Sequence, residues 1–214
     1  VMRLCGIIKI NLRGKDLSKL IMLTLMEPVI YFICETIGVS MTASSEAAII
    51  ISLVPVFTVI FAAIYLKETP TSIQMCFILL SVAGVIFMTA MKGSVLLGAN
   101  VLGTFILMGS VIAAGIFNTF SRKLSSEFTA VEITYMMTLV GAVVFTGISL
   151  VQHLINGNIA HYFYPLGNMK ALVCVIFLGV FASIFAYFML NFLLSQVEAS
   201  RVSVISNVAT VISV

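Results

Sequence analysis

The sequence contains little charge and few of the residues that carry most catalytic chemistry. Only 9% of its 214 residues are charged and 61% are hydrophobic, whereas a soluble domain carries about 25% charged residues. Tryptophan is absent, histidine occurs twice, and the only aspartate is Asp16. No G-x-x-x-x-G-K-[ST] loop is present to bind nucleotide phosphates, and the net charge of +3 is scattered along the chain. The sequence therefore argues against a soluble domain, against ATP hydrolysis by this chain and against nucleic-acid binding.

The four cysteines lack the spacing of a metal or redox site. Cys5, Cys34, Cys76 and Cys174 each lie in an apolar segment, with no C-x-x-C pair and no histidine-rich neighbourhood. Cysteines in such segments are mostly small buried hydrophobic residues. We therefore expect no disulfide, no metal and no other cofactor.

Long apolar runs are what the sequence has in abundance. A helix needs about 20 apolar residues to cross a hydrocarbon core about 30 Å thick. Full spans are predicted at residues 20–39, 46–66, 73–91, 101–120, 131–151 and 171–194, with a seventh, shorter run at 202–214. Residues 1–12 resemble the end of another helix. We therefore expect an all-α, polytopic helical membrane protein with further helices beyond both ends of this chain.

Basic residues concentrate in alternate connectors. The connectors at 13–19, 67–71, 121–127 and 195–201 hold Arg13, Lys15, Lys19, Lys67, Arg122, Lys123 and Arg201. The connectors at 40–44, 92–100 and 152–170 hold only Lys92 and Lys170. Because cytoplasmic loops carry the excess of lysine and arginine, we predict that the first set is cytoplasmic and that the protein is a multi-pass protein of the cytoplasmic membrane.

The two halves of the chain resemble each other weakly. Tyr31-Phe32-Ile-Cys-Glu35 matches Tyr187-Phe188-Met-Leu-Asn191 at an offset of 156 residues. The repeat contains five spans, and since this number is odd, the second copy is inverted in the membrane. Inverted repeats are typical of secondary transporters, which bind substrate near the midplane between the copies. We therefore predict two units, at residues 1–92 and 100–214.

Short motifs in both units resemble one transporter family. The segment from Ala43 to Glu68 has a small-residue start, a proline at Pro55 within the helix and a terminal Leu-x-Glu. This segment, followed by Gln74 and Gly84-Val-Ile, is similar to an EamA unit of the drug/metabolite transporter superfamily. The motifs that resemble the second unit are Gly103, Phe117-Asn118, Arg122, Gly179-Val180, Ser183 and Tyr187.

The resemblance covers nearly the whole chain and implies ten helices in two inverted five-helix units. On that template the first helix, most of the second, the end of the ninth and the tenth would be missing from both ends of this chain. Thr210 departs from the pattern, because the family often has proline there. The resemblance also implies export of small molecules.

Two glutamates lie inside the first full span. An ionised Glu at the centre of a membrane helix costs about 2.5–3.5 kcal/mol, so Glu27 is expected to face the bundle interior or a wet cavity. Glu27, Tyr31 and Glu35 recur every four residues and therefore share one helical face. We expect this face to bind substrate or a proton; the alternative is structural hydrogen bonding to a neighbouring helix.

Other spans carry polar faces as well. Ser183, Tyr187 and Asn191 recur every four residues on the sixth span, which is the inverted counterpart of the first. The two faces are therefore predicted to line one cavity. Asn118 on the fourth span and Asn207 on the last run are further substrate-binding candidates. The alternative for the small and amide residues is hydrogen bonding between helices, worth about 0.6 kcal/mol each.

Pro28 and Pro55 lie inside spans, where each removes a backbone hydrogen bond. We predict that they act as hinges; the alternative is a static kink.

Taken together, these features predict a non-enzymatic secondary transporter of small metabolites, amino acids or amphipathic drugs, whose partners are a small-molecule substrate and the lipid bilayer. A proton is one option for the coupling ion. The alternatives are an intramembrane enzyme acting on lipids, and a membrane subunit or sensor that transports nothing. Substrate identity, transport direction, coupling ion and oligomeric state stay open at this point.

Overall fold

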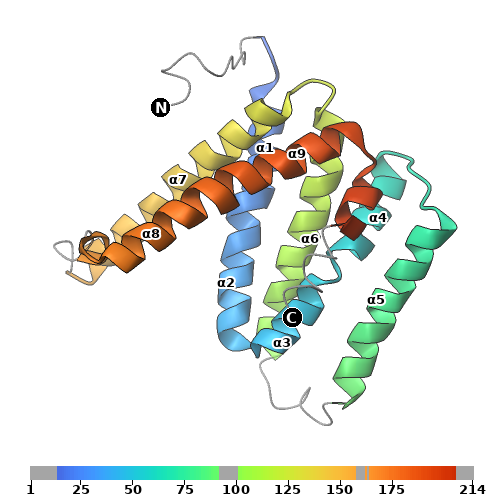
Figure 1. Cartoon of the computed structure of the whole chain (residues 1–214), viewed down its shortest axis with the longest axis horizontal. Coiled ribbons are helices and arrows are strands. Elements are labelled where there is room, and N and C mark those ends of the chain that lie inside the picture. Colours follow the sequence, from blue (N-terminus) through green and yellow to red (C-terminus); the bar gives the residue numbers. More distant parts are fainter. Residues whose placement is uncertain (1–13, 92–100, 158–161, 163, 206–214) are drawn as a thin grey trace.

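The computed structural model describes residues 14–91, 101–157, 162 and 164–205, and Figure 1 shows the chain. Every regular element among those residues is helical. The elements are α1 (Leu17–Thr24), the π-helix η1 (Leu25–Ile30), α2 (Tyr31–Met41), α3 (Ser44–Ile51), α4 (Val54–Tyr65), α5 (Ser72–Met91), α6 (Val101–Leu124), α7 (Ala130–Ile155), the short 3-10 helix η4 (Tyr164–Gly167), α8 (Met169–Phe177), the π-helix η5 (Leu178–Ala186) and α9 (Tyr187–Gln196).

Five helical segments in the described part of the chain are long and apolar enough to cross a membrane. They are Leu17–Met41, Glu46–Tyr65, Val101–Leu124, Ala130–Ile155 and Met169–Gln196. The predicted span at 73–91 is also helical, as α5. The expected fold class, an all-α polytopic membrane protein, is confirmed. The helices extend a few residues beyond several predicted ends, so His153, which falls within the predicted connector 152–170, lies in the last turn of α7.

The first span is interrupted at Glu27 and Pro28. Glu27 has φ −140° and ψ 120°, which are not helical values, and the peptide bond that joins it to Pro28 is cis. A residue that precedes proline is disfavoured in the α region, and proline itself has no N–H to continue the helix. The backbone therefore opens into the π-helix η1 between α1 and α2 at this point.

The second span is also divided. Helix α3 ends at Ile51 and α4 begins at Val54, with Pro55 in the first turn of α4. Proline is favoured in the first turn because its missing N–H would have no helical partner there. The predicted single helix at 46–66 is thus two helices joined at Ser52 and Leu53.

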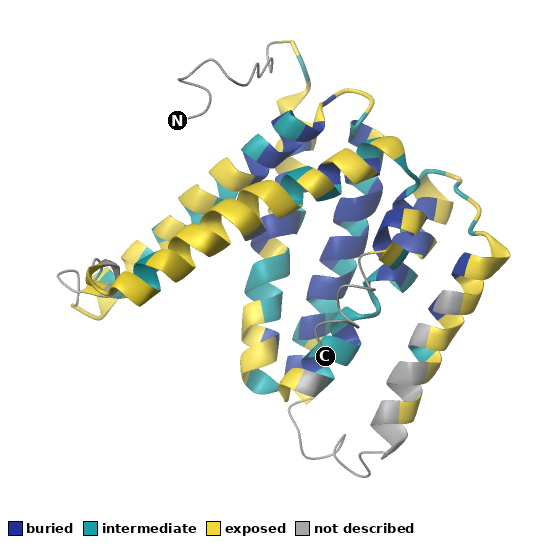
Figure 2. Cartoon of the chain, in the orientation of Figure 1, coloured by how far each residue is buried: buried dark blue, intermediate teal, exposed yellow. Residues whose placement is uncertain are grey.

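Helix α6 is the centre of the bundle and packs against α2, α3 and α4. Its approach to α4 is close enough that a Cβ on Gly115 would lie 2.9 Å from the Cβ of Phe57 and 3.1 Å from its carbonyl carbon. Figure 2 shows buried residues concentrated on α6 and on the helices around it. Helix α8 has no buried residue, and the exposed side chains of α8 and η5 are mostly apolar, as on helices that face lipid.

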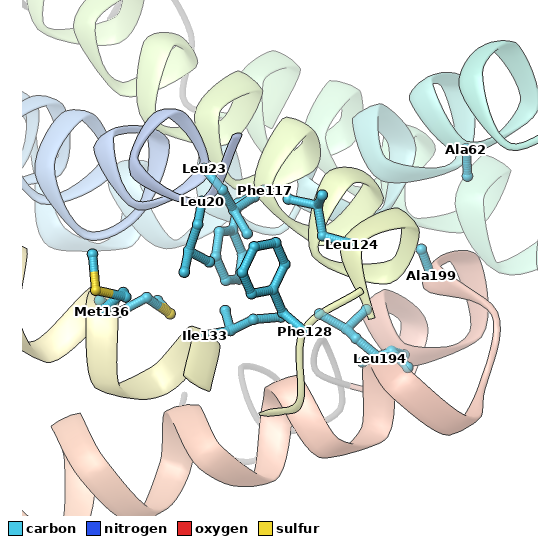
Figure 3. Close-up of a cluster of buried hydrophobic side chains, with 12 residues drawn as sticks. Leu20, Leu23, Ala62, Phe117, Leu124, Phe128, Ile133, Met136, Leu194 and Ala199 are labelled. Carbon is cyan, nitrogen blue, oxygen red and sulfur yellow. The ribbon is translucent and has the colours of Figure 1, made fainter. Parts of the chain in front are cut away.

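One core cluster lies where α1, α6, α7 and α9 meet. Figure 3 shows Phe117 and Phe128, which are 0% and 1% exposed, among Leu20, Ile133 and Leu194. Because lipid tails are as apolar as these side chains, such a cluster stabilises a membrane bundle through close packing more than through removal from water.

Three cysteines differ from the expectation of burial. Cys34 is half-buried, whereas Cys76 and Cys174 are exposed, and all three are free thiols. A lipid-facing helix surface provides an apolar environment without burial inside the protein, so an apolar sequence context alone cannot separate the two. Cys5 lies outside the described residues.

Ion pairs join the connectors at one end of the bundle. The Lys15 ammonium lies 2.6 Å from the Glu132 carboxylate, and Lys19 lies 3.4 Å from Glu127. On the other side of α6, the guanidinium of Arg122 lies 3.9 Å from the Glu68 carboxylate. Arg122 also donates to the backbone carbonyls of Leu194 (3.2 Å) and Ser195 (2.8 Å) at the end of α9.

These contacts bring the connectors near residues 15, 68, 122–132 and 195–200 to the same end of the molecule (Figure 1). They include parts of all four basic connectors that the charge pattern assigned to one side of the membrane.

Candidate substrate-binding site

Four predicted site residues lie together where α2 and α9 face each other. Glu27, at the helix break, is 7% exposed, and its carboxyl group lies next to the Tyr187 hydroxyl. One turn along, the Tyr31 hydroxyl donates to the Glu35 carboxylate over 3.0 Å. Tyr187 lies within electrostatic range of Glu27, Tyr31 and Glu35. The structure therefore gathers two carboxyl groups and two phenols from two helices.

A cavity of about 460 Å³ adjoins this cluster. It lies between α2, α7 and the π-helical segment η5, and Tyr187 is the cluster residue that lines it. The residues that line it are Pro28, Phe32, Thr36, Met137, Thr138, Gly141, Ala142, Phe145, Gly179, Ser183 and Tyr187.

On the first span, the cavity is lined by a helical face one residue away from the predicted one. The lining face is Pro28, Phe32 and Thr36, whereas the prediction named Glu27, Tyr31 and Glu35. Successive residues are about 100° apart around a helix, so the two faces are neighbours. The carboxyl groups consequently lie beside the cavity, and Glu27 reaches it through its contact with Tyr187.

Aromatic rings from three spans meet at Phe32. The centroid of its ring lies 6.5 Å from that of Tyr187 at an interplanar angle of 87°, and 6.3 Å from that of Phe145 at 74°. The Tyr31 ring lies 5.2 Å away at 75°. Edge-to-face arrangements of this kind are favourable between aromatic quadrupoles, and three of these rings, those of Phe32, Phe145 and Tyr187, line the cavity.

The remaining candidates are distributed differently. Ser183 lines the cavity, and its hydroxyl donates to the Leu178 carbonyl over 3.1 Å. Asn118 donates to the Thr58 hydroxyl over 3.3 Å, on the α4 side of α6. Asn207 lies outside the described residues.

Asn191 is fully buried among three neighbouring side chains. Its amide oxygen accepts from Ser121 (2.9 Å), and its amide nitrogen donates to the Thr134 hydroxyl (3.0 Å) and the Met137 sulfur (3.4 Å). The amides of Asn118 and Asn191 thus hydrogen-bond neighbouring helices in this structure, and a direct role for them in binding substrate stays a prediction.

The two prolines also differ in position. Pro28 lines the cavity opposite Gly141, where an added Cβ would lie 3.0 Å from the proline Cγ. Pro55 is buried in the first turn of α4 and is not among the cavity-lining residues.

Sequence reasoning missed the contribution of α7. Met137, Gly141 and Phe145 recur every four residues and line the cavity, but an apolar face of this kind has no polar residue to distinguish it from a lipid-facing one. It also missed Glu132, a 2% exposed carboxylate that forms a capping box with Thr129 as well as the ion pair with Lys15. The Thr-x-x-Glu sequence before an apolar run is the signal that could have found it.

Comparison with known proteins places this arrangement in a family. The chain is 37% identical over 210 residues to "Uncharacterized transporter YcxC" of Bacillus subtilis (strain 168), a match that covers 98% of the chain and 67% of that protein. It is 26% identical over 203 residues to "Uncharacterized transporter" of Archaeoglobus fulgidus, covering 91% of the chain and 65% of that protein.

The chain therefore spans about two thirds of the length of these curated relatives. No solved structure matches it. Residues 3–90 and 101–214 match the profile of the EamA-like transporter family. The resemblance read from the sequence is confirmed: this chain belongs to the EamA-like transporter family.

Proposed function

We propose that the protein is a secondary transporter that moves small organic molecules across the cytoplasmic membrane by alternating access. The observation that carries the proposal is the cavity of about 460 Å³ between α2, α7 and η5, which adjoins a buried glutamate at a helix break. Glutamate within a membrane helix is rare and usually marks a substrate or proton pathway. Both curated relatives also carry the word transporter in their names.

The cavity lies between parts of both predicted units, 1–92 and 100–214. Pro28 and Phe32 come from the first, and Gly141, Phe145 and Tyr187 come from the second. A site between two inverted units near the midplane is the usual arrangement in secondary transporters. On this proposal, rocking of the units relative to each other opens the cavity to the two faces in turn, with Pro28 as the hinge next to it.

We assign the end of the bundle that holds the ion pairs to the cytoplasmic face. The basic connectors 13–19, 67–71, 121–127 and 195–201 support this, because lysine and arginine are enriched on that side. The Lys15–Glu132 and Arg122–Glu68 pairs, with the packed cluster around Phe117, hold the helices together there. We therefore interpret this conformation as closed towards the cytoplasm. Export as the physiological direction rests on the family.

Glu27 is the proposed coupling residue. It is buried, lies at a break in its helix and contacts Tyr187, which lines the cavity. Binding and release of a proton there would change the charge beside the substrate, and so would link proton movement to substrate movement.

The experiment is transport by the full-length protein in proteoliposomes. A panel of amino acids and amphipathic amines is tested with and without a pH gradient, in the parent protein and in Glu27→Gln. A pH gradient should drive movement of at least one compound in the parent, and the variant should lose that dependence.

Glu198→Gln is the matched control, because Glu198 pairs with Arg201 in the connector after α9, away from the cavity. It should behave like the parent. If no compound moves faster than in empty liposomes, the proposed function is wrong. If Glu27→Gln retains the full response to pH, the proton role of Glu27 is wrong.

A further inference from the structure

We propose that the cavity selects aromatic or otherwise apolar organic cations that carry no carboxylate of their own. The inference rests on the proposed function and names the substrate class of the same site. The charges around the cavity support it. Two carboxyl groups, Glu27 and Glu35, lie in the cluster beside it, and no lysine or arginine is among the residues that line it.

The basic side chains of the described residues lie at the ends of the helices. Lys15, Lys19, Arg122 and Lys123 are at the ion-paired end, and Lys170 is in the first turn of α8. A carboxylate or phosphate on a substrate would therefore lie near the Glu27 and Glu35 carboxyl groups beside the cavity, and no lysine or arginine among the lining residues could pair with it. A charged group that is moved out of water is destabilised unless an opposite charge accompanies it.

The aromatic rings favour the same class of ligand. Phe32, Phe145 and Tyr187 come from three spans and line the same cavity. The interplanar angle between the Phe32 ring and the Phe145 ring is 74°, and that between the Phe32 ring and the Tyr187 ring is 87°. Cations bind against aromatic faces, and groups of differently oriented rings are the usual site for ammonium groups. The Glu27 carboxyl group, which lies next to the Tyr187 hydroxyl, adds negative potential beside the Tyr187 ring.

The remaining lining residues suit an apolar substituent on the cation. Met137, Ala142, Gly141 and Gly179 offer no hydrogen-bonding side chain, and the polar groups are limited to hydroxyls such as those of Thr36 and Thr138. An ammonium group with an aromatic or aliphatic substituent matches both parts of the cavity. An amino acid matches less well, because no lysine or arginine lines the cavity to pair with its carboxylate.

The test compares three ligands that share a phenyl ring and a tetrahedral head group but differ in charge. They are phenyltrimethylammonium (+1), its carbon isostere tert-butylbenzene (0) and benzenesulfonate (−1). Binding to the purified full-length protein in detergent is measured by titration calorimetry, with protein-free micelles as the blank. The cation should bind at least about tenfold more tightly than the neutral compound, and the anion should show no saturable binding.

Two ring variants test whether the cation occupies this cavity. Phe32→Leu and Phe145→Leu each remove one ring from a different helix, and each should weaken cation binding by about 2- to 30-fold, the range for one cation–π contact. Phe105→Leu is the matched control, since Phe105 is 71% exposed on α6 and does not line the cavity. It should bind like the parent.

Equal affinity for the cation and its neutral isostere, or preference for the anion, would overturn the inference. So would cation binding that neither ring variant weakens. Because binding is measured at equilibrium without transport, the two proposals fail separately. Transport of neutral or anionic compounds without cation binding overturns the substrate class alone, and cation binding without transport of any compound overturns the transporter function alone.

Discussion

Buried polar residues in these spans fall into two groups. Asn118 and Asn191 hydrogen-bond side chains of neighbouring helices. Glu27 and Tyr187 interact with each other beside a cavity, and Tyr187 lines it. An amide in an apolar interior requires partners for both its oxygen and its nitrogen, and Asn191 has them. The first group therefore hydrogen-bonds helices to one another in this structure, and the second lies at the cavity.

We predict that Asn191→Leu destabilises the protein by about 1–2 kcal/mol, because it removes the hydrogen bond that Ser121 donates to the amide and the one that Thr134 accepts from it. Thermal unfolding of the purified protein without ligand measures the change. Asn156→Leu, at the exposed end of α7, is the control and should unfold like the parent. If Asn191→Leu kept its stability but lost ligand binding, Asn191 would instead belong to the binding site.

Among the helices, the length of the apolar runs and the positions of the prolines were enough to predict most elements. Continuous apolar runs predicted the spans, and Pro28 lies where the first span departs from helical geometry. The face that lines the cavity was predicted one residue away. Neighbouring faces differ by about 100°, and the choice between them depends on packing partners distant in the sequence. One example is Leu107, which lies against Gly38.

The sequence predicted only part of the candidate site, for a related reason. Polar residues stand out in an apolar span, so the sequence singled out Glu27, Tyr31, Glu35 and Tyr187, which the structure places together beside the cavity; their role in binding stays a prediction. The apolar walls from α7 could not be found, because a membrane helix is apolar on its lipid-facing side as well as on its cavity side. Contacts between spans, such as that of Phe145 with Phe32 and that of Gly141 with Pro28, distinguish the two sides.

The close contact between α4 and α6 predicts that a larger side chain at Gly115 destabilises the bundle. Gly115→Val places a branched side chain where even a Cβ would lie 2.9 Å from Phe57, so the two helices have to separate. We expect a loss of about 1–3 kcal/mol or more from overpacking, measured as a lower unfolding temperature. Gly147→Val is the control, because nothing lies within 4 Å of a Cβ at Gly147. Equal effects of both variants would contradict the close packing of α6.

At the scale of the whole molecule, the ion pairs and the charge pattern point to one common face. Contacts such as Lys15–Glu132 and Arg122–Glu68 tie connectors from both predicted units together. The η4–α8 region lies at the far end of α7 (Figure 1), and Lys170 is in the first turn of α8. This arrangement predicts which parts of the chain share a side of the membrane.

Labelling of single cysteines in cells tests this topology. In a background with every native cysteine of the full-length protein replaced by alanine, Ser126→Cys and Gln196→Cys should react with a membrane-impermeant maleimide only after permeabilisation. Met169→Cys, which is exposed at the start of α8, should react in intact cells. Reaction of Ser126→Cys and Gln196→Cys from opposite sides of the membrane would contradict the fold. If both of these reacted in intact cells and Met169→Cys reacted only after permeabilisation, the assigned orientation would be wrong.

Alternating access requires that one cavity residue can be reached from both faces of the membrane. Ser183 lines the cavity, and Ser183→Cys in the cysteine-free background can be modified in sealed vesicles of either orientation. Alternating access predicts reaction with an impermeant thiol reagent from each face, slowed on both sides by a transported substrate. Reaction from one face only, under all conditions, or from neither face, would contradict it.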